Sequence, residues 1–246
     1  MLESAKIFDT LVKERRSVRI YEQENDFDGE AVQRSLERAV LAPNSSNMQL
    51  WEFYRIVDPA KRKQIAKYCM NQNAARTARE LVVIVVRKDK WKQRAKFMYD
   101  YHKKKIGDKP KAEYSKRENR YLNYFGKLMP MYYFSDWFGI WGWIRKLIVF
   151  VASFWRPVVW QVSNADLRVV CHKSAALAAQ TFMLSMQAEG YDTCPMEGLD
   201  SWKVRRYLKL PFSAEINMII ACGKAKSEGI YHERIRVPNE EVIFTI

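Results

Sequence analysis

Three arginines and a serine near the N-terminus are the first residues whose types and spacing suit a ligand. Arg15, Arg16 and Arg19 surround Ser17 within five residues. Guanidinium groups match the oxygens of a phosphate, and a hydroxyl adds a further donor. The same composition is also typical of a solvated basic surface, so the segment alone leaves both interpretations open.

Two further segments carry comparable chemistry. Arg234 and Arg236 form a second basic pair near the other end of the chain. The stretch CPMEGLD, residues 194–200, places Pro195 and Gly198 around Glu197. That composition favours a turn whose backbone N–H groups point outward, although a plain connection between two helices would look alike.

The segment LAPNSSNMQLWEF, residues 41–53, is dense in amides and hydroxyls just where a buried strand should begin. Its polar residues are Asn44, Ser45, Ser46, Asn47 and Gln49. Either this is an ordinary helix-to-strand connection, or its polar groups bond to something other than protein.

No set of side chains indicates acid–base, nucleophilic or metal chemistry. The four cysteines form no CxxC pair and no cluster with the three histidines, which favours reduced thiols in the cytoplasm. The N-terminus has acids at Glu3 and Asp9 and no long apolar core, so it predicts neither a secretion signal nor an anchor.

Helical and strand patterns alternate along the chain. Helices are predicted up to about Lys13, from Gly29 through Leu41, from Pro59 onward, over 165–189 and over 201–210; strands are predicted over 51–57, 81–86 and 216–223. With 246 residues and no Gly/Ser-rich linker, this predicts one α/β domain with an insertion at about 90–160.

Taken in order, the motifs resemble the FMN-dependent nitroreductase family. The motifs are Arg15-Arg16-Ser17-Val18-Arg19, Pro43-Asn44-Ser45-Ser46-Asn47-Met48-Gln49-Leu50-Trp51, Pro195-Met196-Glu197-Gly198-Leu199 and Arg234-Ile235-Arg236. The resemblance covers about residues 1–87 and 165–246. It departs from the family pattern at Asn44, where Ser is usual, and at Leu50, where Pro is usual.

The resemblance implies a role for each motif residue around FMN. The phosphate would be held by Arg15, Ser17, Arg234 and Arg236, with Arg16 supporting the phosphate or ribityl end and Arg19 near the pyrimidine edge. The ring would be lined, from the partner subunit, by Pro43, Asn44, Ser45 and Asn47. Glu197 and Gly198 would offer backbone N–H groups to N5 and O4, and Asn71 or Asn73 would reach the flavin edge.

The resemblance also implies an α+β, three-layer fold with a central mixed sheet, a homodimer, and a C-terminal arm, 237–246, that crosses to the partner. Its activity would be that of an NAD(P)H-dependent FMN oxidoreductase with ping-pong transfer to a small substrate such as a nitroaromatic or a quinone. Reductive dehalogenation is the nearest alternative.

The insertion is basic and aromatic. Residues 88–127 hold 14 Lys and Arg against 5 Asp and Glu, and residues 128–160 hold five of the eight tryptophans. Interleaved aromatics and cations also suit single-stranded nucleic acid, but no nucleic-acid motif supports that interpretation.

On a helical wheel, one face of the insertion collects Trp137, Trp141, Ile144, Ile148, Val151 and Trp155. Arg145 and Lys146 fall in the middle of this run, which argues against a membrane span. The face would therefore pack on the domain or across a dimer, or would lie on a membrane surface through 128–160. A non-catalytic membrane or nucleic-acid binding module is the rival to the enzyme.

Overall fold

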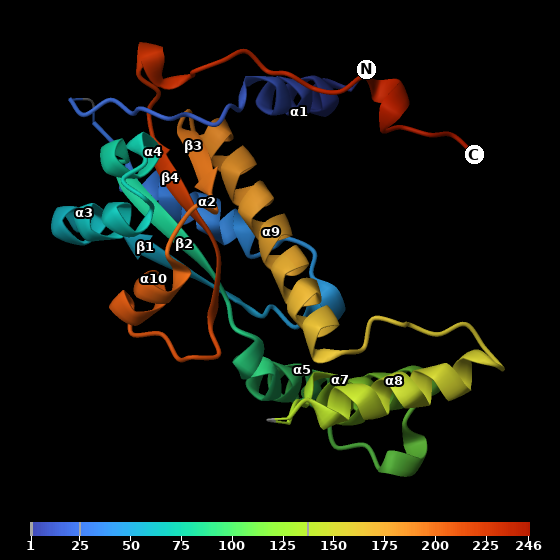
Figure 1. The fold of residues 1–246 in the computed structure, drawn as a ribbon. Helices are drawn as coiled ribbons and strands as arrows, with labels where there is room; N and C mark the ends of the chain where they lie inside the picture. Colours follow the sequence, from blue (N-terminus) through green and yellow to red (C-terminus); the bar gives the residue numbers. More distant parts are fainter. Residues whose placement is uncertain (1, 25, 137) are drawn as a thin grey trace.

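The computed structural model describes residues 2–24, 26–136 and 138–246. Its centre is a sheet of four strands, β1 (Trp51–Ile56), β2 (Glu80–Val86), β3 (Asp192–Met196) and β4 (Glu215–Gly223), in the order β1-β2-β4-β3 (Figure 1). All three strand pairs are antiparallel. A single parallel bridge joins Ser17 to Thr193 at the β3 edge, so the parallel part of the predicted mixed sheet is limited to this contact.

The sheet separates two apolar cores because its central strands alternate. On β2, Val82 and Ile84 face one core, whereas Leu81 and Val83 face the other. Helices α2 (Gly29–Ala39) and α9 (Asn164–Ala188) cover the first face. Helices α3 (Pro59–Tyr68), α4 (Asn73–Thr77) and α10 (Ser201–Tyr207) cover the second. The predicted three-layer α+β fold is thereby confirmed.

The helix starts follow from their capping residues. Asp58 accepts a hydrogen bond from the Lys61 N–H (2.8 Å) and Pro59 occupies the first turn of α3. Ser163 and Asp166 form a capping box that starts α9. This long helix supplies much of the first core; it begins beside the insertion and runs along the sheet away from it (Figure 1).

The insertion is a set of helices that projects beyond the N-terminal end of α9 in Figure 1. Its elements are η2 (Lys88–Lys90), α5 (Trp91–Ile106), η3 (Lys111–Glu113), α6 (Lys116–Asn123), the π-helical η4 (Tyr124–Leu128), α7 (Met129–Tyr133) and α8 (Ile140–Ser153). Met98, Phe125, Met129 and Tyr133 are buried in the same core as α9. The base of the insertion is therefore part of the main hydrophobic core.

Helix α8 shows the reverse of the expected orientation. Of the predicted apolar face, Trp137 lies outside the described residues, and Trp141 is half-buried. Ile144, Ile148, Val151 and Trp155 are exposed, whereas Gly142 and Arg145 are buried. The expectation that this apolar face packs on the domain is therefore wrong for the chain by itself.

The two ends of the chain lie together on one side of the molecule (Figure 1). Helix α1 (Glu3–Glu14) has no buried residue, and two short 3-10 turns follow β4, η5 (Ser227–Gly229) and η6 (Asn239–Glu241). The arm 237–246 is exposed and contains η6. Among the described residues, no helix combines the length and apolarity needed to cross a membrane.

Candidate functional site

Both basic clusters predicted from the sequence line one cavity of about 260 Å³. The N-terminal segment contributes Arg15, Arg16, Ser17 and Arg19, and residues 230–236 contribute the opposite wall. Segments more than 200 residues apart in the sequence thus meet around a single space. The predicted convergence of these arginines is present in the structure.

Hydrogen bonds between the two segments hold this cavity in shape. The Arg16 side chain donates to the His232 carbonyl, and Arg234 donates to the carbonyls of Val12 (3.0 Å) and Arg15. The Arg19 N–H donates to the Gly229 carbonyl at 2.7 Å. These contacts tie the cluster to the edge of the sheet, because the neighbouring Val18 N–H donates to Thr193 on β3 (3.2 Å).

Five arginines and one carboxylate, that of Glu233, line the cavity, so its lining is strongly positive. Within the described part of the chain, none of the five arginines has a carboxylate partner within 4.0 Å. Burial lowers the pKa of Arg15, and repulsion from Arg234 and Arg236 lowers it further. The Arg15 Nη1 is buried without a hydrogen-bond partner among the described residues. Such a cluster is completed by a bound anion, and a phosphate fits its donors.

The turn after β3 supplies the second part of the site. Glu197 and Gly198 are exposed, and no described residue accepts a hydrogen bond from their backbone N–H groups. Ser17 is bridged to Thr193, the second residue of β3, and Glu197 follows four residues later, about 13 Å along an extended chain. The phosphate donors and the free N–H groups are therefore spaced for a ligand with a phosphate at one end and a ring at the other.

Gln72 holds this turn and was not predicted from the sequence. Its Nε2 donates to the Gly198 carbonyl at 2.7 Å. Of the two expected amides, Asn73 donates to the Tyr231 hydroxyl (2.9 Å), which lines the arginine cavity, while the Asn71 backbone bonds to Ala66. Gln72 lies between the two predicted amides, Asn71 and Asn73, and this position was the available signal in the sequence. Composition alone does not show which of three neighbouring loop residues faces the turn.

The polar loop 43–47, which was predicted to line the flavin ring, is separate from the arginine cavity. It contains the 3-10 turn η1 (Ser45–Asn47), in which Ser46 and Asn47 have φ values of 55° and 52°. Asn44 accepts from the Gln49 N–H (2.8 Å), and the Ser45 N–H donates to Ser174 on α9 (3.2 Å). These polar groups are thus satisfied within the protein, while Pro43 and Asn47 remain exposed. None of these residues lines the arginine cavity.

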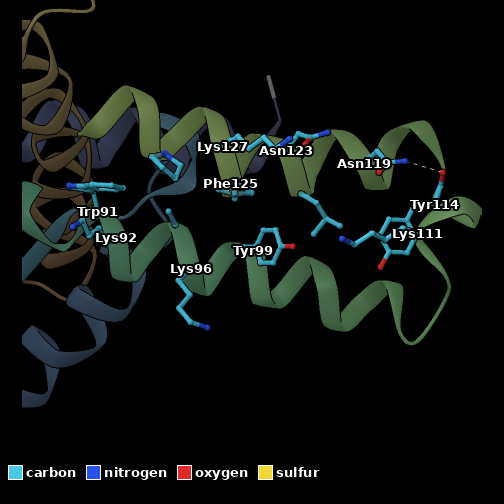
Figure 2. A pocket seen from close by; sticks show the side chains of 14 residues that line it. Trp91, Lys92, Lys96, Tyr99, Lys111, Tyr114, Asn119, Asn123, Phe125 and Lys127 are labelled. Atoms are coloured by element: carbon cyan, nitrogen blue, oxygen red, sulfur yellow. Dashed lines mark hydrogen bonds between the residues drawn. The ribbon is translucent and has the colours of Figure 1, made fainter. Parts of the chain in front are cut away.

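The insertion contacts this loop directly. The Ser46 and Tyr124 hydroxyls are 2.7 Å apart, and a cavity of about 920 Å³ is lined by Ser46, Asn47 and residues of α5 and α6. Another cavity, of about 630 Å³, lies within the insertion between α5 and the helix formed by α6 and η4, where Figure 2 shows Trp91, Tyr99 and Phe125 among lysines. No acidic residue lines it. Among the described residues, no His, Cys, Asp or Glu cluster could hold a metal ion.

Comparisons with known proteins identify the family of the chain. The profile of the nitroreductase family matches residues 12–224. Protein DrgA of Synechocystis is 28% identical over 234 residues, which cover 94% of this chain and 90% of DrgA. A Bacillus subtilis protein named as an NAD(P)H nitroreductase, MhqN, is 23% identical, with 96% of this chain and 97% of MhqN covered.

A solved structure gives the same result for the fold. A nitroreductase of Exiguobacterium sibiricum in complex with FMN superimposes with a TM-score of 0.68 at 22% identity, covering 97% of each chain. At that identity the likeness establishes the fold only. The profile match spans most of the sequence and includes the N-terminal arginines and the turn after β3, whereas Arg234 and Arg236 lie beyond it. The chain belongs to the nitroreductase family.

Proposed function

We propose that the protein is an NAD(P)H-dependent FMN oxidoreductase that reduces a small electron-poor substrate. The relative MhqN carries the name of an NAD(P)H nitroreductase, and the Exiguobacterium relative binds FMN. The observation that carries the proposal is the cavity in which Arg15, Ser17 and Arg234 meet without a carboxylate partner among the described residues.

The phosphate end of FMN is assigned to this cavity. Arg15, Ser17, Arg234 and Arg236 hold the phosphate, because a bound anion supplies the negative charge that offsets the half-buried guanidinium of Arg15. Arg16 supports the phosphate or the ribityl chain from its bond to the His232 carbonyl. Part of the site is built before the ligand arrives, since the side chains of Arg16, Arg234 and Arg236 already donate to backbone carbonyls.

The ring end is assigned to the turn after β3. When bound, FMN supplies the redox chemistry, accepting a hydride from NAD(P)H and passing electrons to the substrate. The Glu197 and Gly198 N–H groups orient the ring by hydrogen bonds at N5 and O4. Arg19 places a positive charge at the pyrimidine edge, which favours the reduced, anionic state. No side chain of the protein is required as an acid, base or nucleophile.

A homodimer completes the proposed site. The arginine cavity and the loop 43–47 do not share a lining residue in one chain, so the loop of a second copy is assigned to the ring. The exposed α1 and the exposed arm 237–246 lie together and offer surface for the partner (Figure 1). Residues 1–246 act as one unit in this assembly, with 90–160 capping the site.

The substrate and location follow from the same proposal. The nicotinamide leaves before a nitroaromatic, quinone or similar acceptor takes its place, which gives ping-pong kinetics. Cys69, Cys171, Cys194 and Cys222 are all free and buried, which suits a reducing compartment such as the cytoplasm.

The test is an absorbance spectrum of the purified protein followed by anaerobic titration with NADH and with NADPH. A yellow protein whose flavin absorbance bleaches on addition of a nicotinamide is the expected result. Protein that purifies colourless and takes up no added FMN would contradict the proposal.

A further inference from the structure

Helix α8 presents an apolar face to solvent over its whole length. Trp143, Ile144, Leu147, Phe150, Val151 and Phe154 recur at helical spacing on one side, and all are exposed. Leu147 lies at the centre of this face with 63% of its surface exposed, and Trp155 follows at 78%. A helix at the surface of a water-soluble protein shows the opposite pattern, with its polar side outward.

The buried side of α8 explains why this orientation is fixed. Arg145 is 4% exposed and donates to the carbonyls of Val162 (2.7 Å), Tyr132 (2.9 Å) and Phe134 (2.6 Å), and to the Asn164 side chain (2.8 Å). Of the two charges in the middle of the helix, Arg145 therefore points into the protein, whereas Lys146 is exposed. Arg145 clamps α8 to the chain before and after it and turns the apolar side outward.

The charged residues next to this face in the sequence are all positive. No acidic residue occurs between Asp136 and Asp166, and both of these carboxylates cap helix N-termini. Lys146 and Arg156 are exposed, and the Lys146 ammonium lies 5.4 Å from the centre of the Trp143 ring. The insertion as a whole, residues 88–163, holds 17 Lys and Arg against 6 Asp and Glu.

We propose that α8 and the residues that follow it, 140–160, dock the protein on an anionic lipid membrane. Hydrocarbon accepts the apolar side chains, tryptophans prefer the interface, and anionic headgroups attract the cations. A second copy of this chain is a poorer cover for the same face, because two such basic insertions repel each other. The helix has 14 residues, about 21 Å, so it lies in the interface and does not span the membrane.

The test measures binding of the full-length protein to sedimented vesicles, either neutral phosphatidylcholine or a mixture with phosphatidylglycerol. Wild-type protein is expected to bind the anionic vesicles, with binding that weakens as salt is added. Leu147→Glu is expected to lower the partition coefficient onto the anionic vesicles roughly tenfold, since it places a carboxylate in the centre of the face. Phe212→Glu is the matched control, because Phe212 is 86% exposed and lies after α10, far from the insertion in sequence.

Light scattering after gel filtration, without lipid, separates the remaining outcomes. If Leu147→Glu changes the oligomeric state and the wild type ignores anionic vesicles, the face is an interface between copies and the proposal is overturned. Equal vesicle binding by wild type, Leu147→Glu and Phe212→Glu would also overturn it. FMN content and bleaching by NAD(P)H are measured on the same samples, so failure of the redox function is seen independently of lipid binding.

Discussion

At the scale of single residues, the proposed site depends on guanidinium groups that have no carboxylate within 4.0 Å among the described residues. Arg15 shows this most directly, because it is half-buried, Arg234 and Arg236 repel it, and its buried Nη1 lacks a partner among the described residues. Structures tolerate such repulsion where a ligand relieves it.

We predict that Arg15→Ala and Arg236→Ala each weaken FMN binding by about 1.5–3 kcal/mol, roughly 10- to 150-fold in Kd, because each removes a charge-assisted phosphate contact. Flavin fluorescence during titration of the apoprotein measures the constant. Arg206→Ala on α10 is the matched control, since its guanidinium instead stacks on the Trp202 ring, 4.5 Å from its centre. Unchanged affinity in both cavity variants would rule out the assigned phosphate site.

Gln72 is a positioning residue in this arrangement. Its amide fixes the Gly198 carbonyl and thereby the N–H groups of the turn. Gln72→Ala is expected to slow anaerobic flavin reduction by NAD(P)H about tenfold, because the turn loses one orienting hydrogen bond. The affinity for FMN is expected to stay near that of wild type. Stopped-flow absorbance gives the rate. The control is Asn71→Ala, and a Gln72→Ala enzyme with a wild-type reduction rate would remove Gln72 from the site.

The two arginine clusters could be recognised in the sequence because each is local, and the family resemblance implied that they converge, as they do around one cavity. Their contacts with a phosphate stay a prediction. Gln72 could not be recognised in this way, because its role depends on how a loop between α3 and α4 meets a turn 126 residues later. The contacts of Pro43 and Asn47 with a partner subunit stay a prediction.

At the scale of elements, strong periodicity was a sound guide. The continuous apolar run of β2 and the capped helices α3 and α9 lie where they were predicted, within a few residues. Strand β3 was missed, since Pro195 and the following Glu-Gly suggest a turn. An edge strand tolerates proline, and β3 pairs with β4 alone among the named strands.

Hydrophobic periodicity also failed to orient α8. The pattern identifies an apolar side but does not state whether protein, lipid or a second chain covers it. The orientation of α8 is set instead by Arg145, whose side chain donates hydrogen bonds to four acceptors within residues 132–164.

The clamp around Arg145 makes a prediction of its own. Arg145→Met should leave four buried or half-buried acceptors without their donor and destabilise the α7–α8 region by about 2–4 kcal/mol. Amide hydrogen exchange should accelerate over 129–164 and remain slow in β2. Arg156→Met, at an exposed site, is the comparison. Wild-type exchange rates in Arg145→Met would show that the hydrogen bonds do not hold the helix.

The packing of α2 on α9 should depend on acid pH. Hydrogen bonds from Arg34 (2.6 Å) and Arg38 lower the pKa of Glu189 from 4.5 to about 2. A lowered pKa means that this ion pair stabilises the fold fully above pH 4.5 and loses its effect as pH falls toward 2. Glu189→Gln should therefore have a lower Tm than wild type at pH 7, and the difference should shrink on acidification. A difference in Tm that is constant from pH 7 to pH 3 would contradict the assignment.

At the scale of the whole molecule, two functions occupy different parts of the chain. The arginine cavity lies where the two chain ends meet the β3 edge, whereas α8 lies at the outer side of the insertion, beyond the end of α9 (Figure 1). The insertion also touches the loop 43–47 through Tyr124 and Ser46. The surface proposed to bind lipid is therefore connected, through the insertion, to the loop assigned to the flavin ring.

This continuity predicts that the choice of electron acceptor depends on the membrane. With anionic vesicles that contain a long-chain quinone, NAD(P)H oxidation by wild type should exceed that by Leu147→Glu roughly tenfold, in line with the expected loss of partitioning. With a short-chain, water-soluble quinone and no vesicles, the two proteins should have equal rates, because Leu147 touches neither the arginine cavity nor the turn after β3. Equal rates with the vesicle-bound quinone would show that docking does not deliver substrate, even where vesicle binding itself is observed. A slow Leu147→Glu enzyme in the water-soluble assay would instead point to damage at the flavin site, which the FMN absorbance of the same sample would reveal.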